Sequence, residues 1–308
     1  MFTIITSTDY ELSGLRKELS SLASGPRGRR SEARAQYTCP NLEVIGVGKE
    51  HAQATVRMML KEQAAQPDSS AFNNDSGLLL LGVAGAVDPA LNTGDLVLSS
   101  RYFRNSQISD LRRLDVSTGP TLIPDVAMWD LAVKACQAGG RNPLFTDSLT
   151  VDRVISSPEQ KKSIVDAYPV GIVEMEDYWV AEVAAEFGVA FLSARVVLDT
   201  AKQALPPWLL GLSGSKQKAG LSLAARPWRI PTVVRLARQY PVVQESLTRF
   251  ALNFLAEAAQ TEIRGNGKKD SASLLSASLS ASLEEAGDDT SQANQDTLTA
   301  SASITVGV

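Results

Sequence analysis

Short apolar runs alternate with helix-like stretches along roughly the first two thirds of this chain. The runs that predict strands cover residues 2–6, 42–47, 78–84, 95–99, 171–174 and 190–198. Apolar positions at helical spacing predict helices over 9–22, 50–62, 124–138 and 176–187. The run Leu78–Leu81 is continuous rather than alternating, which is typical of a strand covered on both faces. Strands that alternate with helices predict a layered α/β domain.

The segment 261–308 differs from the rest of the chain. It is rich in Ser, Ala and Asp and holds no aromatic residue. Such a composition cannot bury enough apolar surface to offset the entropy lost on ordering. We therefore expect one catalytic domain over 1–260, followed by a disordered tail over 261–308. The alternative for the tail is a short amphipathic helix around Ser271–Glu285.

Composition excludes several classes of protein. Hydrophobic residues make up 44% of the 308 residues, yet no apolar run reaches the ~18 residues of a spanning helix. His51 is the one histidine, and Cys39 and Cys136 are the only cysteines, which excludes a two-histidine metal site and a disulfide scaffold. The start at Met1–Leu12 has no basic residue, so we expect no secretory signal and a cytoplasmic location.

Charge is unevenly distributed along the chain. Residues 1–201 carry a formal charge of −6, residues 202–261 carry +6, and residues 262–308 carry −4. Within the basic part, Trp208, Leu209 and Trp228 alternate with lysines and arginines, which suits a membrane interface or an anionic lipid surface through 205–238. We expect a divergent basic and apolar insertion over 202–230 and a final helix over 231–259. The alternative to membrane contact is that this helix packs on the acidic body. A sequence pI near 5.3 argues against nucleic acid as a partner.

Three acidic residues follow predicted strands. Glu11 comes after the first strand, Glu176 lies where a strand passes into a helix, and Asp199 ends the strand 190–198. Ligands of open α/β sheets bind beyond the carboxyl ends of strands, so one cleft could collect all three. Taken alone the signal is weak, because acidic residues are also favoured in the first turns of helices.

The segment Val173–Ala201, VEMEDYWVAEVAAEFGVAFLSARVVLDTA, resembles the purine nucleoside phosphorylase superfamily, and within it the methylthioadenosine/S-adenosylhomocysteine nucleosidases. Glu176 and Asp199 stand 23 residues apart, as in that family, and Arg195 stands four residues before Asp199. Gly82–Tyr102, Gly46–Lys49 and Ile4–Leu12 resemble further family segments in the same order. The resemblance implies an enzyme with a three-layer α/β/α fold around a twisted mixed sheet, and no metal or organic cofactor.

The resemblance also implies roles. Asp199 would be the general acid at N7 of a purine, Glu176 would hold the ribose hydroxyls, and Glu11 would position or deprotonate the attacking water. Residues expected to contact the substrate are Met175, Glu174, Arg195, Val154, Ile155, Ala84 and Gly85. The expected partner is a small purine nucleoside of adenosyl type, and the expected assembly is a homodimer.

Three alternatives stay open. The strand before Gly82 lacks an arginine that a phosphate would need, so water is favoured over phosphate as nucleophile. The segment after Asp199 resembles hopanoid-associated members of the superfamily, which act on an adenosyl lipid, and Leu198 stands where a serine is usual. In a different class, the chain would be a nucleoside- or lipid-binding module without catalysis. Retention of all three acids argues against that class.

Overall fold

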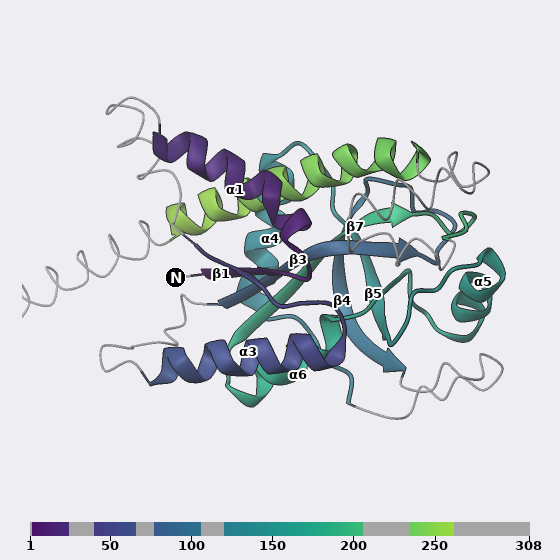
Figure 1. The fold of residues 1–308 in the computed structure, drawn as a ribbon, viewed down its shortest axis with the longest axis horizontal. Coiled ribbons are helices and arrows are strands. Elements are labelled where there is room, and N and C mark those ends of the chain that lie inside the picture. Colours follow the sequence, from purple (N-terminus) through teal and green to yellow (C-terminus); the bar gives the residue numbers. More distant parts are fainter. Residues whose placement is uncertain (1, 25–39, 66–76, 106–119, 206–233, 262–308) are drawn as a thin grey trace, which may run out of the picture. The chain divides into compact units, whose positions relative to one another are not determined.

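The computed structural model describes residues 2–24, 40–65, 77–105, 120–205 and 234–261 (Figure 1). The strands are β1 (Phe2–Thr6), β2 (Asn41–Val44), β3 (Gly77–Ala86), β4 (Leu96–Asn105), β5 (Leu144–Val151), β6 (Ile172–Glu174) and β7 (Ala190–Asp199). The helices are α1 (Asp9–Ser24), α3 (Lys49–Ala64), α4 (Val126–Ala138), α5 (Pro158–Ala167) and α6 (Asp177–Glu186), and residues 234–261 are also helical. The contacts divide the chain into 1–259 and 260–308, and the site lies in the first unit.

The strands form one mixed sheet in the order β2-β1-β3-β6-β5-β4-β7. β3 pairs in parallel with β1 and with β7, and antiparallel with β6, while β4 pairs antiparallel with β7. The pairing of β3 with β7 closes β3, β6, β5, β4 and β7 into a ring. The predicted mixed sheet is confirmed, and its closure is a feature that the alternation of elements does not reveal.

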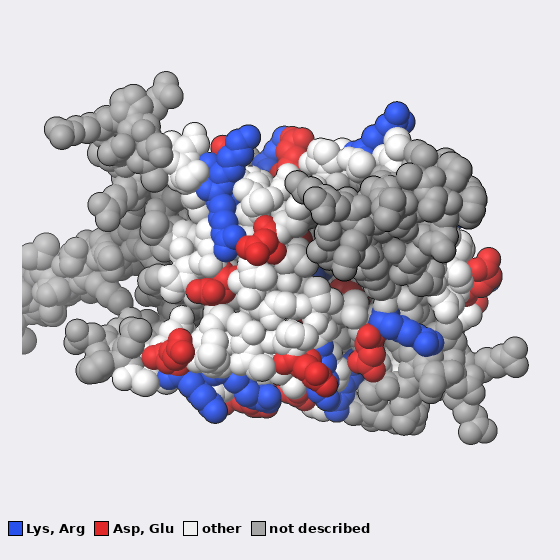
Figure 2. Space-filling view, in the orientation of Figure 1, with Lys and Arg blue, Asp and Glu red and all other residues white. Residues whose placement is uncertain are grey.

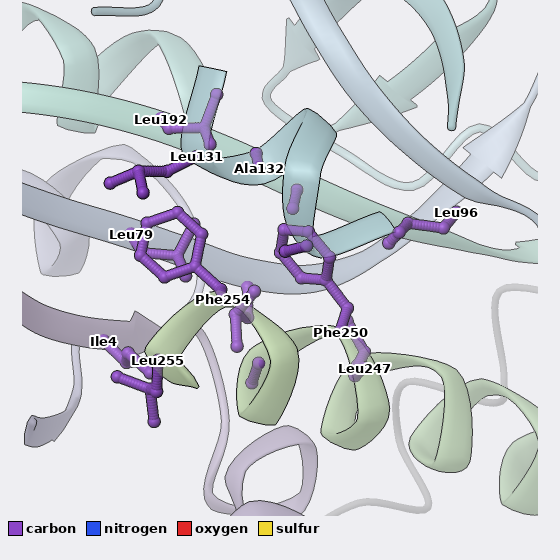
Figure 3. Packing of buried hydrophobic residues seen from close by; sticks show 14 of the residues in the cluster. Ile4, Leu79, Leu96, Leu131, Ala132, Leu192, Leu247, Phe250, Phe254 and Leu255 are labelled. Atoms are coloured by element: carbon purple, nitrogen blue, oxygen red, sulfur yellow. The ribbon is translucent and has the colours of Figure 1, made fainter. Parts of the chain in front are cut away.

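Helices cover both faces of the sheet, which confirms the three-layer arrangement (Figure 1). One face of the sheet, which includes Leu79, Leu81 and Leu192, is covered by α1, α4 and the helix 234–261. Figure 3 shows Phe250 and Phe254 of that helix in this core. On the other face, α3 and α6 pack on Leu78 and Leu80. Alternate residues of one strand thus enter two cores, which explains why β3 is apolar throughout.

Two elements were missed from the sequence pattern. β5 has the sequence LFTDSLTV, whose buried Asp147, Ser148 and Thr150 interrupt the apolar run. α5 begins with a capping box in which Ser157 accepts a hydrogen bond from the Gln160 N–H, and Pro158 occupies the first turn. This Ser-Pro-x-Gln pattern is a helix start signal that the apolar spacing alone does not register.

The other expectations fall partly outside the described residues. The tail 262–308 and most of the basic segment, 206–233, lie outside them, and residues 234–261 are helical where the sequence predicts a helix over 231–259. No helix among the described residues is long and apolar enough to cross a membrane. On the face seen in Figure 2, acidic and basic side chains are interspersed along the edge where α3 and α6 lie, where Arg57 and Glu186 form an ion pair.

Candidate active site

A cavity of about 340 Å³ lies where β1, β3, β6 and β7 approach their carboxyl ends. Its volume falls within the range of pockets that hold small organic ligands. All ten residues named from the sequence line it: Glu11, Ala84, Gly85, Val154, Ile155, Glu174, Met175, Glu176, Arg195 and Asp199. The lining also includes residues that the sequence did not assign to the site: Ser7, Thr8, Val47, Val83, Val151, Val173, Leu198, Leu205 and Leu236. The fold therefore brings residues from both ends of the chain's first unit into one cavity.

Glu11 is held by both carboxylate oxygens at the start of α1. Its Oε1 accepts the Val83 N–H at 3.0 Å, and its Oε2 accepts the N–H of Thr8 at 2.9 Å and the hydroxyl of Thr8 at 3.0 Å. Burial raises the pKa of the Glu11 carboxyl, although Arg195 acts in the opposite direction. A buried carboxylate with a raised pKa is a stronger base than an exposed one.

Arg195 is the cation around which the other carboxylates gather. Its Nε and Nη2 donate to Asp177 Oδ1 at 2.8 and 2.6 Å, and Nη2 also lies 3.2 Å from Glu174 Oε2 and 3.3 Å from Glu176 Oε2. The guanidinium is fully buried. Asp177 receives a further hydrogen bond from the Ser193 hydroxyl at 2.6 Å. Asp177 does not line the cavity itself, so it holds Arg195 in place from behind the lining residues.

Glu174 is a structural hub of the turn between β6 and α6. Its Oε2 accepts the N–H groups of Glu176 and Asp177, each at 2.6 Å, and its Oε1 bonds to the hydroxyl of Thr150. Burial and the neighbouring Asp177 raise the pKa of Glu174. These contacts hold the backbone that carries Glu176.

Glu176 is the carboxylate of this group that bonds to the backbone just before α3. Its Oε1 accepts the Gly48 N–H at 3.1 Å, and its Oε2 accepts from Arg195. Gly48 is the residue before α3 and has a φ of +82°, a conformation that favours glycine and aims this N–H at the carboxylate. Glu176 is thus held at both oxygens while it lines the cavity.

Asp199 ends β7 and is buried at the cavity wall, where its Oδ2 forms an ion pair with the buried Lys161 of α5. Burial raises the pKa of Asp199, and Lys161 and Arg235 act against that rise. Gly85 packs against this carboxylate, since a Cβ there would lie 3.4 Å from both of its oxygens. The sequence pattern identified Asp199 but not Lys161.

The sequence of this chain matches the model of a known protein family. A family model described as "Phosphorylase superfamily" matches residues 2–215. The chain belongs to this superfamily. The predictions of the superfamily, of its fold and of an enzyme of the nucleosidase or nucleoside phosphorylase kind are therefore confirmed.

Solved structures share this fold at low sequence identity. The 5′-methylthioadenosine/S-adenosylhomocysteine nucleosidase of Campylobacter jejuni matches with a TM-score of 0.56 and 18% identity over 84% of this chain and 98% of its own. The same kind of nucleosidase from Neisseria meningitidis, solved with methylthio-immucillin-A, matches with 0.56 and 16% over 83% and 98%. The futalosine hydrolase of Helicobacter pylori matches with 0.54 and 15% over 84% and 97%.

Among the described residues, no group of three or more His, Cys, Asp or Glu side chains is arranged to hold a metal ion.

Proposed function

We propose that this protein hydrolyses the N-glycosidic bond of a purine nucleoside of adenosyl type. The observation that carries the proposal is that Glu11, Glu176 and Asp199 line one cavity of nucleoside size. Breaking the bond between the sugar C1′ and N9 leaves positive charge on the ribose and passes an electron pair to the purine. Both charges need a partner in a site that is shielded from bulk solvent.

Asp199 donates a proton to N7 as the bond to N9 breaks, so the base departs neutral. Glu11 takes a proton from the water whose oxygen attacks C1′. The sum of these steps is one nucleoside and one water converted to a free base and a free sugar. General acid–base groups of this kind each contribute roughly 10²–10⁴-fold to the rate.

Glu176 accepts hydrogen bonds from the ribose hydroxyls and stabilises the cationic sugar, with Met175 against the ribose face. The carboxyl groups of Glu11, Glu176 and Asp177 outnumber the single guanidinium of Arg195, even when the neighbouring Glu174 holds its proton. This excess of acidic groups favours a cation in the cavity. We assign Glu174 and Arg195 to holding Glu176 in place, because their polar atoms are engaged by protein partners.

The same charge balance favours water over phosphate as the nucleophile. Arg195 is the one cationic residue among the described lining residues, and its guanidinium is occupied by carboxylates. A phosphate anion placed near Glu11 and Glu176 would meet like charges. Phosphorolysis remains the alternative that the assay must exclude.

An adenosyl lipid is the second candidate substrate. Leu198, Leu205 and Leu236 line the cavity, so part of its wall suits an apolar substituent on the ribose 5′ carbon. Val154 and Ile155, expected near the base, add to the same apolar lining. An enzyme that acts on an adenosyl lipid would also contact a lipid surface, and we assign that contact to residues 205–238.

The test is release of free adenine from 5′-methylthioadenosine, S-adenosylhomocysteine and an adenosine carrying an alkyl chain at the 5′ position, each with and without inorganic phosphate. We expect release without phosphate. A strict need for phosphate would replace hydrolysis by phosphorolysis, and no release from any adenosyl compound would overturn the proposal in favour of a binding module.

Two further proposals concern assembly and lipid contact. We expect a homodimer. Light scattering during gel filtration tests this, because a dimer has twice the 32.9 kDa mass of one chain. Flotation with anionic and neutral liposomes, using the full chain and a chain lacking residues 206–230, tests the membrane contact. Equal flotation of the two chains would remove it.

A further inference from the structure

Lys161 is an unusual lysine. Its side chain is fully buried in the first turns of α5, although lysine is almost never fully buried without a partner. A cation near a helix N-terminus also faces the positive end of the helix dipole. The next residue, Lys162, shows the ordinary arrangement, since it is exposed and paired with the exposed Asp166 one turn away.

Every proton of the Lys161 ammonium group has an acceptor. One is directed at Asp199 Oδ2, one at the Thr200 carbonyl oxygen at 2.7 Å, and one at the Gln203 carbonyl oxygen at 3.3 Å. Three acceptors match the three donors of a protonated lysine. The lysine therefore binds both the Asp199 carboxylate and the turn that follows it.

The turn is fixed from other sides as well. Gln203 donates its N–H to the Thr200 carbonyl at 3.0 Å, and its side-chain oxygen accepts the amide of Gln239 from the helix 234–261 at 3.2 Å. The N–H of Leu205 donates to the Ser156 carbonyl at 2.8 Å, just before α5. Lys161 is thus the point where α5, the end of β7 and this turn are joined.

We propose that Lys161 is a positioning residue for Asp199. Lys161 holds Oδ2 so that Oδ1 faces N7 of the purine, and its positive charge stabilises the carboxylate that remains after proton donation. Oδ1 has no side-chain hydrogen-bond partner among the described residues. This inference rests on the proposed function of Asp199 and extends it to a residue outside the cavity lining.

The pH dependence follows from the charges that face Asp199. Lys161 of α5 and Arg235 of the helix 234–261 are the cations that act on it, and both lower its pKa against the effect of burial. A general acid is active while protonated, so kcat/KM falls as the pH rises through its pKa. Without Lys161 the pKa of Asp199 rises, and the alkaline limb moves to higher pH by roughly 1–3 units.

The experiment compares Lys161→Met and Lys161→Gln with the neighbouring control Lys162→Met in the full chain. We expect kcat/KM at neutral pH to fall roughly 10–100-fold in both Lys161 variants, mainly through kcat, because a displaced catalytic group loses rate rather than binding. The alkaline limb should move upward in both Lys161 variants and stay in place in Lys162→Met. Lys161 variants with an unmoved limb would overturn the inference.

Thermal unfolding of Lys161→Met, Asp199→Asn and the double variant gives a readout that needs no turnover. If the two residues form one unit, the shifts in Tm will be non-additive, with the Lys161 change costing less once Asp199 is neutral. Additive shifts would count against the pairing. A wild-type enzyme that releases no adenine would instead defeat the proposed function, so the two failures are distinguishable.

Discussion

Gly82 and Arg195 are in such close contact that no side chain fits between them. A Cβ on Gly82 would overlap the Arg195 Nη1 and would lie 3.2 Å from its Cζ and 3.1 Å from Glu11 Oε1. Gly82 pairs with Arg195 across β3 and β7, so the guanidinium and the Glu11 carboxylate lie directly over this glycine. The glycine lets the arginine reach its carboxylates.

Gly82→Ala should therefore displace the guanidinium and disturb Glu11 and Glu176 together. We expect kcat/KM to fall about 100-fold, the order of loss that follows a displacement of ~1 Å in catalytic groups. The assay is adenine release at fixed pH.

Gly77→Ala is the matched control at the other end of β3. Its Cβ would meet the flexible Met128 side chain, with Sδ at 2.6 Å, and would lie 3.1 Å from the Ala190 carbonyl oxygen, and none of these residues lines the cavity. It should lower Tm but keep kcat. Equal loss of activity in both variants would show that the Gly82 effect is general loss of folding.

Asp199→Asn removes the proposed acid while keeping the shape of the side chain. We expect kcat to fall at least ~100-fold, because an amide cannot donate the proton that a carboxylic acid donates. Asp166→Asn, an exposed aspartate at the end of α5, is the control and should keep full activity. An unchanged rate in Asp199→Asn would end the assignment of Asp199 as general acid.

Arg195→Met should be strongly destabilising. It leaves Asp177, Glu174 and Glu176 without their shared cation, and breaking a buried ion pair in this way costs about 3–5 kcal/mol. The free energy of unfolding in urea measures the loss. Arg57→Met, which removes an exposed ion pair with Glu186, should change it by about 1 kcal/mol or less. Similar losses in the two variants would contradict the cluster's role.

Convergence of Glu11, Glu176 and Asp199 was predictable because each follows a strand, and strand ends of an α/β sheet meet at one edge. Their partners were harder to foresee. Thr150 lies in β5, whose polar residues hide the apolar pattern of a strand. The Thr150 hydroxyl donates a hydrogen bond to Glu174. Lys161 looks like any lysine of a polar helix, since only the tertiary fold makes it differ from exposed Lys162. Sequence patterns record burial of apolar groups well and buried polar pairs poorly.

Glu174 should make the stability of the fold depend on pH. Its raised pKa in the folded state, about 8, means that the folded protein holds this proton to higher pH than the unfolded chain does. Between pH 5 and 8 the folded state therefore binds more protons, so this carboxyl lowers the free energy of unfolding as the pH rises.

Glu174→Gln should remove that contribution. The amide oxygen can accept the N–H groups of Glu176 and Asp177, as Oε2 of Glu174 does. The Thr150 hydroxyl now donates to Oε1, and the amide nitrogen can instead donate to that hydroxyl oxygen, so the contact is kept with its direction reversed. Urea unfolding at intervals from pH 5 to 8 should give a flatter pH dependence than wild type, whereas Glu18→Gln, on the exposed side of α1, should match wild type. A Glu174→Gln curve parallel to wild type would mean that Glu174 is ionised throughout this range, with Arg195 outweighing its burial.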